Sequence, residues 1–334
     1  MVFSQEGTVT LETVHLLTYG GRTVVDCLLF DRQPIYVWDA AHGVVLLSTT
    51  DGTLWTFDLT TESLRNVGYS RGDLLGPVLS PDGTQAVLES GPDDSGWAIK
   101  IVDLDSGASR IIRQVGPNEY FRAGLVPLRW LQGGILLTPG VLDCGFSGGI
   151  LKLDPVTGGL APVSNGEVGV LSQSGASHAY SDYSNLADAN YLGQCGWHNT
   201  LFTAPLGAQP TLIRKEANRD FYARDMRDDG SVLYTSDDSP GSDAAPAADM
   251  GLYLFSGGLS YKQFGEDRIG EWQSAVFVGP DAAIATEQLS NGPNGSAEVI
   301  LVTLCRSSSC HATATAIDNP TGPDPYVRLV SVRP

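Results

Sequence analysis

The feature that most constrains the fold is a two-residue turn, usually containing Gly, that recurs along the chain between two short apolar segments. The turns occur at His42-Gly43, Asp82-Gly83, Gln132-Gly133, Ser174-Gly175, Asp229-Gly230 and, without its Gly, Pro280-Asp281. They lie about 40 to 55 residues apart, a period typical of the blades of a β-propeller. About seven such units would fill the chain, so the sequence predicts about seven blades, with six as the alternative count.

A second signature alternates with these turns: an apolar segment ends in Asp, and a short turn leads to another apolar segment. Clear copies are found at 55–64, 101–111 and 151–160, and copies without the Asp at 201–213 and 252–264. Asp can cap such a turn through its side chain, and Gly tolerates positive φ. Two signatures that alternate in phase argue against a set of unrelated hairpins.

Apolar residues rarely recur with helical spacing, whereas short alternating or β-branched runs are bounded by Gly, Asp, Asn and Pro throughout. We therefore expect a single all-β domain, residues 1–334, built as a propeller of four-stranded blades. Residues 33–317 would form six blades. Residues 1–32 and 318–334 would form a closing blade from both termini, which removes open sheet edges. Six blades with an added N-terminal hairpin is the competing arrangement.

One repeat carries a family resemblance. Leu79 to Thr84 reads Leu-Ser-Pro-Asp-Gly-Thr and resembles the SPDG turn of the TolB-like and WD40-like bacterial propeller repeats. Asp51 to Asp58 resembles the corresponding strand of quinoprotein-type blades. The resemblance extends over blade-like units in residues 37–316 and implies a propeller architecture, but no particular activity. The Gly-His and Trp-Asp dipeptides of eukaryotic WD40 repeats are absent at their expected places.

The charge balance excludes several partners. Lys and Arg number 20 against 38 Asp and Glu, a net charge of -18, which would repel nucleic acids and anionic lipid surfaces. The chain contains no apolar run long enough for a membrane span, and residues 1–10 do not resemble a signal peptide. We expect no direct membrane insertion, with any signal absent from this chain.

The predicted loops are unequal, because those between the second and third strands of a blade are long while the other hairpin turns are short. Long loops on one side of a scaffold often carry binding residues. Three segments leading into a blade, 118–122, 218–224 and 268–272, also combine aromatic residues with Arg. The predicted ligand contacts on this side are Tyr120, Arg122, Tyr191, Trp197, Phe221, Tyr222 and Trp272. The alternative is that the aromatic residues wedge between blades and the arginines solvate the rim.

The five cysteines suggest two disulfides. Cys144 and Cys195 precede the third strand of consecutive blades, and Cys305 and Cys310 face each other across a hairpin, whereas Cys27 lies in an apolar run and is expected to be a free thiol. Two disulfides favour an oxidising compartment, so the expected location is extracytoplasmic: secreted, periplasmic or at the cell surface.

Catalytic and metal-binding signals are weak. Gly145 to Gly149 matches G-x-S-x-G but leads into a strand instead of a helix, and the five histidines lack metal-ligand spacing. The acidic strings at 93–94 and 237–238 offer oxygen ligands for Ca²⁺, although a solvated acidic rim explains them better. We therefore expect no metal centre and no cofactor, with Ca²⁺ only weakly supported, while the sequence identifies no catalytic residue and leaves open whether the chain is an enzyme.

These observations predict a non-catalytic, exported recognition or scaffold propeller that binds a protein or a glycan on its long-loop face. One alternative is a glycan hydrolase or lyase with acidic residues at a central channel. Another is a structural component of a cell-surface assembly. The sequence leaves the ligand and the oligomeric state open.

Overall fold

The computed structural model describes eighteen segments of the chain. They are residues 2–3, 16–19, 22–25, 35–49, 51–61, 63–70, 74–93, 96–116, 124–139, 149–164, 169–182, 199–216, 219–238, 251–264, 270–289, 296–307, 313–318 and 327–328. Throughout these segments the regular structure is β-strand, and they contain no helix. The prediction of an all-β chain is confirmed.

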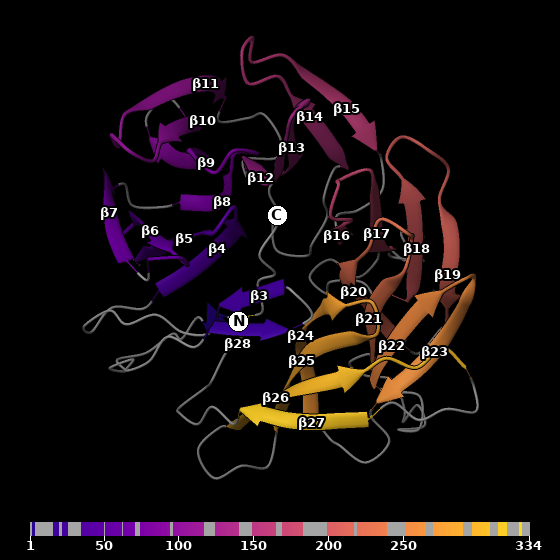
Figure 1. The fold of residues 1–334 in the computed structure, drawn as a ribbon. Helices are drawn as coiled ribbons and strands as arrows, with labels where there is room; N and C mark the ends of the chain where they lie inside the picture. The colour runs from indigo at the N-terminus through magenta and orange to yellow at the C-terminus, as the bar shows by residue number, and fades with distance from the viewer. Residues whose placement is uncertain are drawn as a thin grey trace. The chain divides into compact units, whose positions relative to one another are not determined.

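Six four-stranded antiparallel sheets are present, each made of four consecutive strands (Figure 1). The first three sheets are β4 (Ile35–Ala41), β5 (Val44–Thr49), β6 (Thr53–Asp58) and β7 (Ser63–Ser70); β8 (Leu74–Leu79), β9 (Gln85–Asp93), β10 (Gly96–Asp103) and β11 (Ser109–Val115); and β12 (Leu125–Leu131), β13 (Gly134–Pro139), β14 (Ile150–Leu153) and β15 (Leu160–Ser164). The other three are β16 (Val170–Leu171), β17 (Ser177–Asp182), β18 (Thr200–Pro205) and β19 (Thr211–Lys215); β20 (Arg219–Met226), β21 (Val232–Asp238), β22 (Gly251–Ser256) and β23 (Leu259–Phe264); and β24 (Gly270–Gly279), β25 (Ala282–Leu289), β26 (Ser296–Thr303) and β27 (Thr313–Asp318).

The count of six replaces the predicted count of about seven and agrees with the alternative. The terminal segments do not supply a seventh four-stranded sheet among the described residues. Their strands there are β1 (Val2–Phe3), β2 (Leu16–Tyr19), β3 (Arg22–Val25) and β28 (Val327–Arg328). Dividing the full length by the repeat period overestimated the count, because the terminal residues do not follow the repeat. Closure by 1–32 with 318–334 stays a prediction, since most of these residues lie outside the described segments.

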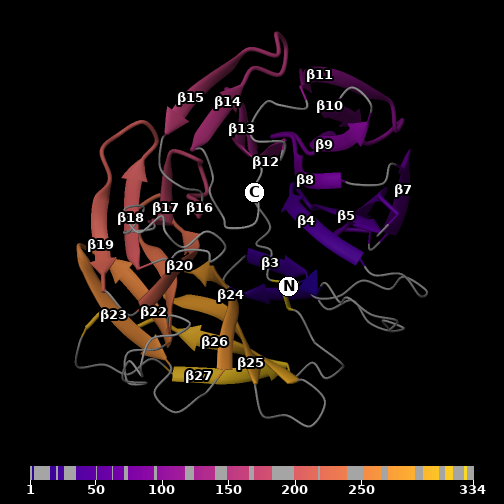
Figure 2. The same ribbon diagram turned by 180° about the vertical axis from the view of Figure 1, so that it is seen from behind.

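The chain divides into two compact units, and each contains three of the sheets. Unit 1 comprises Met1–Leu17, Thr23–Gly166 and Val330–Pro334, and unit 2 comprises Thr18–Arg22 and Glu167–Leu329. Figure 2 shows the same sheets from behind, with sheets one to three in indigo to magenta and sheets four to six in red to yellow.

Within each unit, consecutive sheets pack face to face through apolar side chains. In unit 1, Leu46 of β5 shares a core with Leu88 of β9, and Ile99 of β10 shares another with Ile135 of β13. In unit 2, sheets four and five share one core and sheets five and six another. Because full burial of such a side chain contributes about 1.5 to 3 kcal/mol, these inter-sheet cores hold the sheets together.

The two predicted turn signatures form as expected. In the SPDG turn, Oδ1 of Asp82 accepts hydrogen bonds from the Ser80 hydroxyl (2.6 Å) and the Thr84 amide (3.1 Å). In the second signature, Asp103 Oδ1 accepts from the Ser106 amide at 2.8 Å, and Asp154 Oδ1 accepts from the Val156 amide at 2.8 Å. The carboxylates thus cap their own turns, which is why short local strings could predict them.

Candidate functional site

The connections between strands are unequal, as predicted. Short turns join the first strand of each sheet to the second. Residues 140–149, 183–199 and 239–250 separate the second strand from the third in sheets three, four and five. The prediction of a long loop between the second and third strands is wrong for the second sheet, where β9 continues to Asp93 and β10 begins at Gly96, with which Asp93 pairs. The hydrogen-bonded pairing of β9 with β10 continues through residues that the sequence indicated as loop.

The second strands carry a polar side chain at one repeated position, the fourth or fifth residue of each strand. In five of the sheets its partner on the third strand lies where the ladder between the third and fourth strands shifts register. We call the six residues the second-strand polar positions; they are Ser48, Glu89, Thr138, Ser181, Thr235 and Thr286, and all are buried. Five of the six carry a hydroxyl group, so the position selects a small hydrogen-bonding side chain.

Hydroxyl groups at the second-strand polar positions have hydrogen-bond partners in their own sheet or in the next one. Ser48 Oγ accepts from the indole of Trp38 at 2.9 Å, and Thr235 Oγ1 accepts from Nε of Arg224 at 3.0 Å. Ser181 donates to the carbonyl of Phe221 in the next sheet. A buried hydroxyl needs such a partner, because an unsatisfied polar group in the core is costly.

Glu89 is the exception, since it places a carboxyl group where the other sheets have a hydroxyl. Its side chain is 0% exposed. Oε1 accepts the backbone amide of Leu125, the first residue of β12, at 2.5 Å, whereas Oε2 has no hydrogen-bond partner among the described residues. Burial disfavours the charged form and raises the pKa of Glu89 to about 7, although the Leu125 amide opposes the rise. This pKa would suit a general acid or base, but complete burial keeps the carboxyl group from substrate.

Among the predicted ligand contacts, Phe221 is fully buried and offers no surface to a ligand. Its ring lies edge-on to that of Tyr234, and the guanidinium of Arg214 lies 5.4 Å from the Phe221 ring centroid and 4.8 Å from that of Tyr253. Arg214 Nε also pairs with Glu216 at 2.6 Å. The expectation of ligand contact is corrected here, because the side of β20 that carries Phe221 packs against sheet four. This is the inter-blade wedge that the sequence left as the alternative.

Tyr222 lies on the opposite side of β20 and is partly exposed. The guanidinium of Arg224 stacks on its ring, 5.2 Å from the centroid. The structure therefore separates two adjacent predicted contacts: Phe221 packs in the core, and Tyr222 with Arg224 forms an accessible aromatic and cationic pair.

The remaining predicted contacts are not brought together by the described structure. Trp272 belongs to β24, where its backbone pairs with Glu287 of β25. Tyr120, Arg122, Tyr191 and Trp197 lie outside the described residues. Their part in a site stays a prediction.

Cys305 is disulfide-bonded. Its amide donates to Oε1 of Gln263 at 2.6 Å, and its carbonyl accepts from Nε2 of the same residue at 2.8 Å. The predicted partner Cys310 lies outside the described residues, as do Cys144, Cys195 and Cys27. Both disulfide pairings therefore stay predictions.

The described segments contain no group of three or more His, Cys, Asp or Glu side chains arranged to hold a metal ion. The G-x-S-x-G string lies outside the described residues except for Gly149. Over the same part of the chain, no helix is long and apolar enough to cross a membrane.

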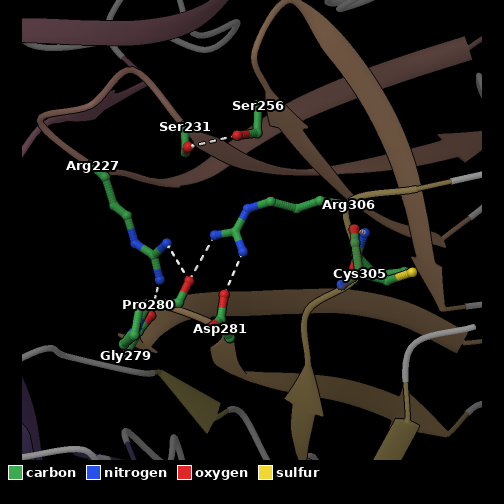
Figure 3. A network of polar contacts seen from close by, with 9 residues as sticks. Arg227, Ser231, Ser256, Gly279, Pro280, Asp281, Cys305 and Arg306 are labelled. Atoms are coloured by element: carbon green, nitrogen blue, oxygen red, sulfur yellow. Dashed lines mark hydrogen bonds and ion pairs between the residues drawn. The ribbon is translucent and has the colours of Figure 1, made fainter. Parts of the chain in front are cut away.

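The short-turn side of unit 2 is held by arginines (Figure 3). Nη1 of Arg227 and Nη2 of Arg306 both donate to the carbonyl of Pro280, at 2.8 and 2.7 Å. Arg306 also pairs with Asp281, and Arg227 donates to the carbonyl of Gly279. These donors bind backbone carbonyls of the turn before sheet six's second strand, so the network fixes one turn against its neighbours.

Comparison with known proteins identifies the fold. No protein-family model matches the chain, and no curated protein matches its sequence. The β-propeller domain of the Trilobed protease from Pyrococcus furiosus matches with a TM-score of 0.52 and 12% identity, over 86% of this chain and 97% of that one. A prolyl endopeptidase matches with a TM-score of 0.52 and 13% identity, over 86% of this chain but 44% of that one. TolB from Acinetobacter baumannii matches with a TM-score of 0.44 and 14% identity, over 89% of this chain and 64% of that one.

At these identities the likeness concerns the fold alone. The chain has a β-propeller fold with six four-stranded antiparallel sheets, so the propeller architecture that the sequence resemblance implied is confirmed. It spans less than half the length of the prolyl endopeptidase, so the activity of that enzyme does not transfer to it.

Proposed function

We propose that this chain is a non-catalytic, exported recognition propeller that binds a protein or a glycan on the side where the second and third strands are joined. The observation that carries the proposal is the inequality of the connections. Long segments separate these strands in sheets three, four and five, whereas the opposite turns are short and hydrogen-bonded. Variable length on one side of a regular scaffold is where binding residues usually concentrate.

Two partly exposed side chains of β20 support a binding role over a reaction. Tyr222 and Arg224 present an aromatic ring and a guanidinium, the groups that most often dominate binding energy. Export is supported by the disulfide-bonded Cys305, because disulfides persist mainly outside the reducing cytosol. The second candidate, a glycan hydrolase or lyase, is favoured by the pKa of Glu89 but opposed by its burial.

The proposal can be tested by finding a partner and then locating its contact. Proteins exported by the source organism and an array of glycans would be offered to the immobilised chain, and the bound component purified for calorimetry. Tyr222→Ala should then weaken binding by about 30-fold, equivalent to about 2 kcal/mol, while Tyr222→Phe retains most of the affinity because the ring remains.

The matched control is Leu259→Ala, a truncation of a 60% exposed side chain at the start of β23, beside the turn between the third and fourth strands of the sheet that holds Tyr222. It should leave binding unchanged. Equal losses of affinity in Tyr222→Ala and Leu259→Ala, with both variants folded, would show that the ligand binds at another surface. Turnover of a bound glycan by the wild-type chain would replace the recognition role with the enzymatic one.

A further inference from the structure

The carboxyl group of Glu89 lies at a junction between two sheets of unit 1. Glu89 belongs to β9, where it pairs with Leu75 of β8 and Ile99 of β10. Its Oε1 reaches the Leu125 amide in the first residue of the next sheet. At the same position, the other five sheets have Ser or Thr. A titratable group has therefore replaced a neutral one at a repeated structural position.

The fit around the carboxyl group is tight. A Cβ atom built on Gly124, which precedes Leu125, would overlap the Glu89 carboxyl group, and Gly124 has φ +77°. Glycine is suited to this backbone conformation and leaves the space that the carboxyl group occupies. Glu89, Gly124 and Leu125 thus form one contact, which we call the β9–β12 junction.

No described cation contributes to the pKa of Glu89, which burial and the Leu125 amide set. On β11, Arg113 lies on the same side of the sheet as Ile99 and Glu89, and its Nη1 donates to the carbonyl of Gly158 at 3.4 Å. β8 has no titratable side chain. On β10, Lys100 follows Ile99 and points to the other side of the sheet, while Asp103 lies at the far end of the strand. On β12, Arg129 lies beyond the bulge that follows Pro127. Asp93 ends β9 itself, and Glu119 and Arg122 of the segment before Gly124 lie outside the described residues.

The two protonation states of Glu89 therefore differ in cost. In both states Oε1 accepts the hydrogen bond from Leu125, and Oε2 has no partner among the described residues. The neutral acid buries no charge, whereas the carboxylate buries a charge with a single donor. An ionised Glu89 gains water ligands only when the junction opens, so ionisation favours opening.

We propose that Glu89 is a proton-operated latch: the neutral acid holds the β9–β12 junction closed, and loss of its proton to solvent favours an open junction in which water solvates the carboxylate. This inference is independent of the proposed binding role. It concerns the pH dependence of one contact within unit 1.

Hydrogen exchange at the Leu125 amide tests the latch, after correction for the intrinsic pH dependence of exchange. With a pKa of about 7 in the closed form and the ordinary value of 4.5 in the open form, the population of the open junction should rise about 30-fold between about pH 5.5 and about pH 8. In Glu89→Gln, which cannot ionise, the protection of Leu125 should be the same at both pH values.

The matched control is Asp105→Asn, which removes one negative charge from the same sheet at a side chain that is 86% exposed. It should retain the full pH dependence. The latch is refuted if Leu125 is equally protected at both pH values in the wild type, or if Glu89→Gln keeps the dependence. Should Glu89→Gln fail to fold, carbon NMR of the glutamate carboxyl groups in the wild-type chain decides: titration of Glu89 near its ordinary pKa of 4.5 also refutes the latch.

Discussion

Oδ2 of Asp39 accepts a hydrogen bond from the backbone amide of Leu79, which lies in the second sheet, at 2.9 Å. Oδ1 of the same carboxylate accepts a hydrogen bond from the amide of Ala40, also at 2.9 Å. Asp225 repeats the arrangement in unit 2, where its two oxygens accept the amides of Phe277 and Met226, both at 2.8 Å. Each aspartate follows a bulge in the first strand of its sheet. A bulge redirects a side chain, and here it directs a carboxylate to the first strand of the next sheet.

Asp39→Ala should therefore lower the free energy of unfolding by about 1.5 to 3 kcal/mol, because the Leu79 amide loses a charged acceptor. Urea denaturation monitored by tryptophan fluorescence would measure the loss. Asp39→Asn should lose less, since its amide oxygen can still accept one of the two bonds. If both variants unfold like the wild type, the contact does not tie the sheets together.

Alanine substitutions at two glycines with positive φ distinguish the free-energy cost of backbone strain from that of a steric clash. Gly107 (φ +71°) would bring a Cβ atom against the carbonyl oxygen of Val67 in the first sheet, whereas Gly230 (φ +83°) has nothing within 4 Å of that position. Gly230→Ala should cost about 1 kcal/mol for the left-handed conformation alone. Gly107→Ala should cost about 3 kcal/mol, since the neighbouring backbone must also move. Equal shifts in the thermal unfolding midpoint would contradict the close approach of these two sheets.

The capped turns make the chain sensitive to acid. Hydrogen bonds from turn residues hold the pKa values of Asp58, Asp103 and Asp154 below the ordinary 3.8. A lowered folded-state pKa stabilises the fold above the unfolded value, and this contribution is lost as pH falls below about 4. The triple variant with Asn at these positions should therefore show a smaller drop in thermal midpoint between about pH 5 and about pH 2. An unchanged drop would assign acid lability to other carboxylates.

The thiol count tests the redox assignment. Cys305 is disulfide-bonded, and the predicted pairs Cys144–Cys195 and Cys305–Cys310 leave Cys27 free. Alkylation without reduction, followed by mass spectrometry, should label Cys27 alone, and peptide mapping should recover both linked pairs. If Cys144 and Cys195 are labelled in protein prepared under oxidising conditions, the predicted disulfide between them is absent. That result would also weaken the case for export.

Most of the local architecture could be predicted from the sequence because it depends on neighbouring residues. Asp82 and Gly83 form a turn because the carboxylate accepts hydrogen bonds two residues away and the glycine adopts a positive φ of 70°. The Asp103 and Asp154 turns follow the same rule. Strand periodicity is equally local, so the all-β class and the repeat were both evident.

The candidate site depended on contacts that the sequence does not show. The predicted count of about seven blades was wrong because it included the terminal residues, which carry no copy of the repeated turn. Phe221 and Tyr222 are adjacent and both aromatic, yet only Tyr222 is accessible, because successive side chains of β20 point to opposite sides and sheet four covers one of them. The hydroxyls at the second-strand polar positions could have been found in the sequence, since each follows the apolar run that begins a second strand.

Alternation along a strand and turn chemistry act over a few residues, and the sequence by itself therefore determined which segments are strands and where they turn. The tertiary structure decided which polar groups lose contact with water. Glu89 follows Leu88 in the middle of β9, as an exposed glutamate also could, and its contacts with Gly124 and Leu125 come from a segment that leads into the next sheet. The free energy of a charge depends on everything packed around it. The pKa of Glu89 therefore depends on the packing of the second sheet against the third, which the sequence alone does not show.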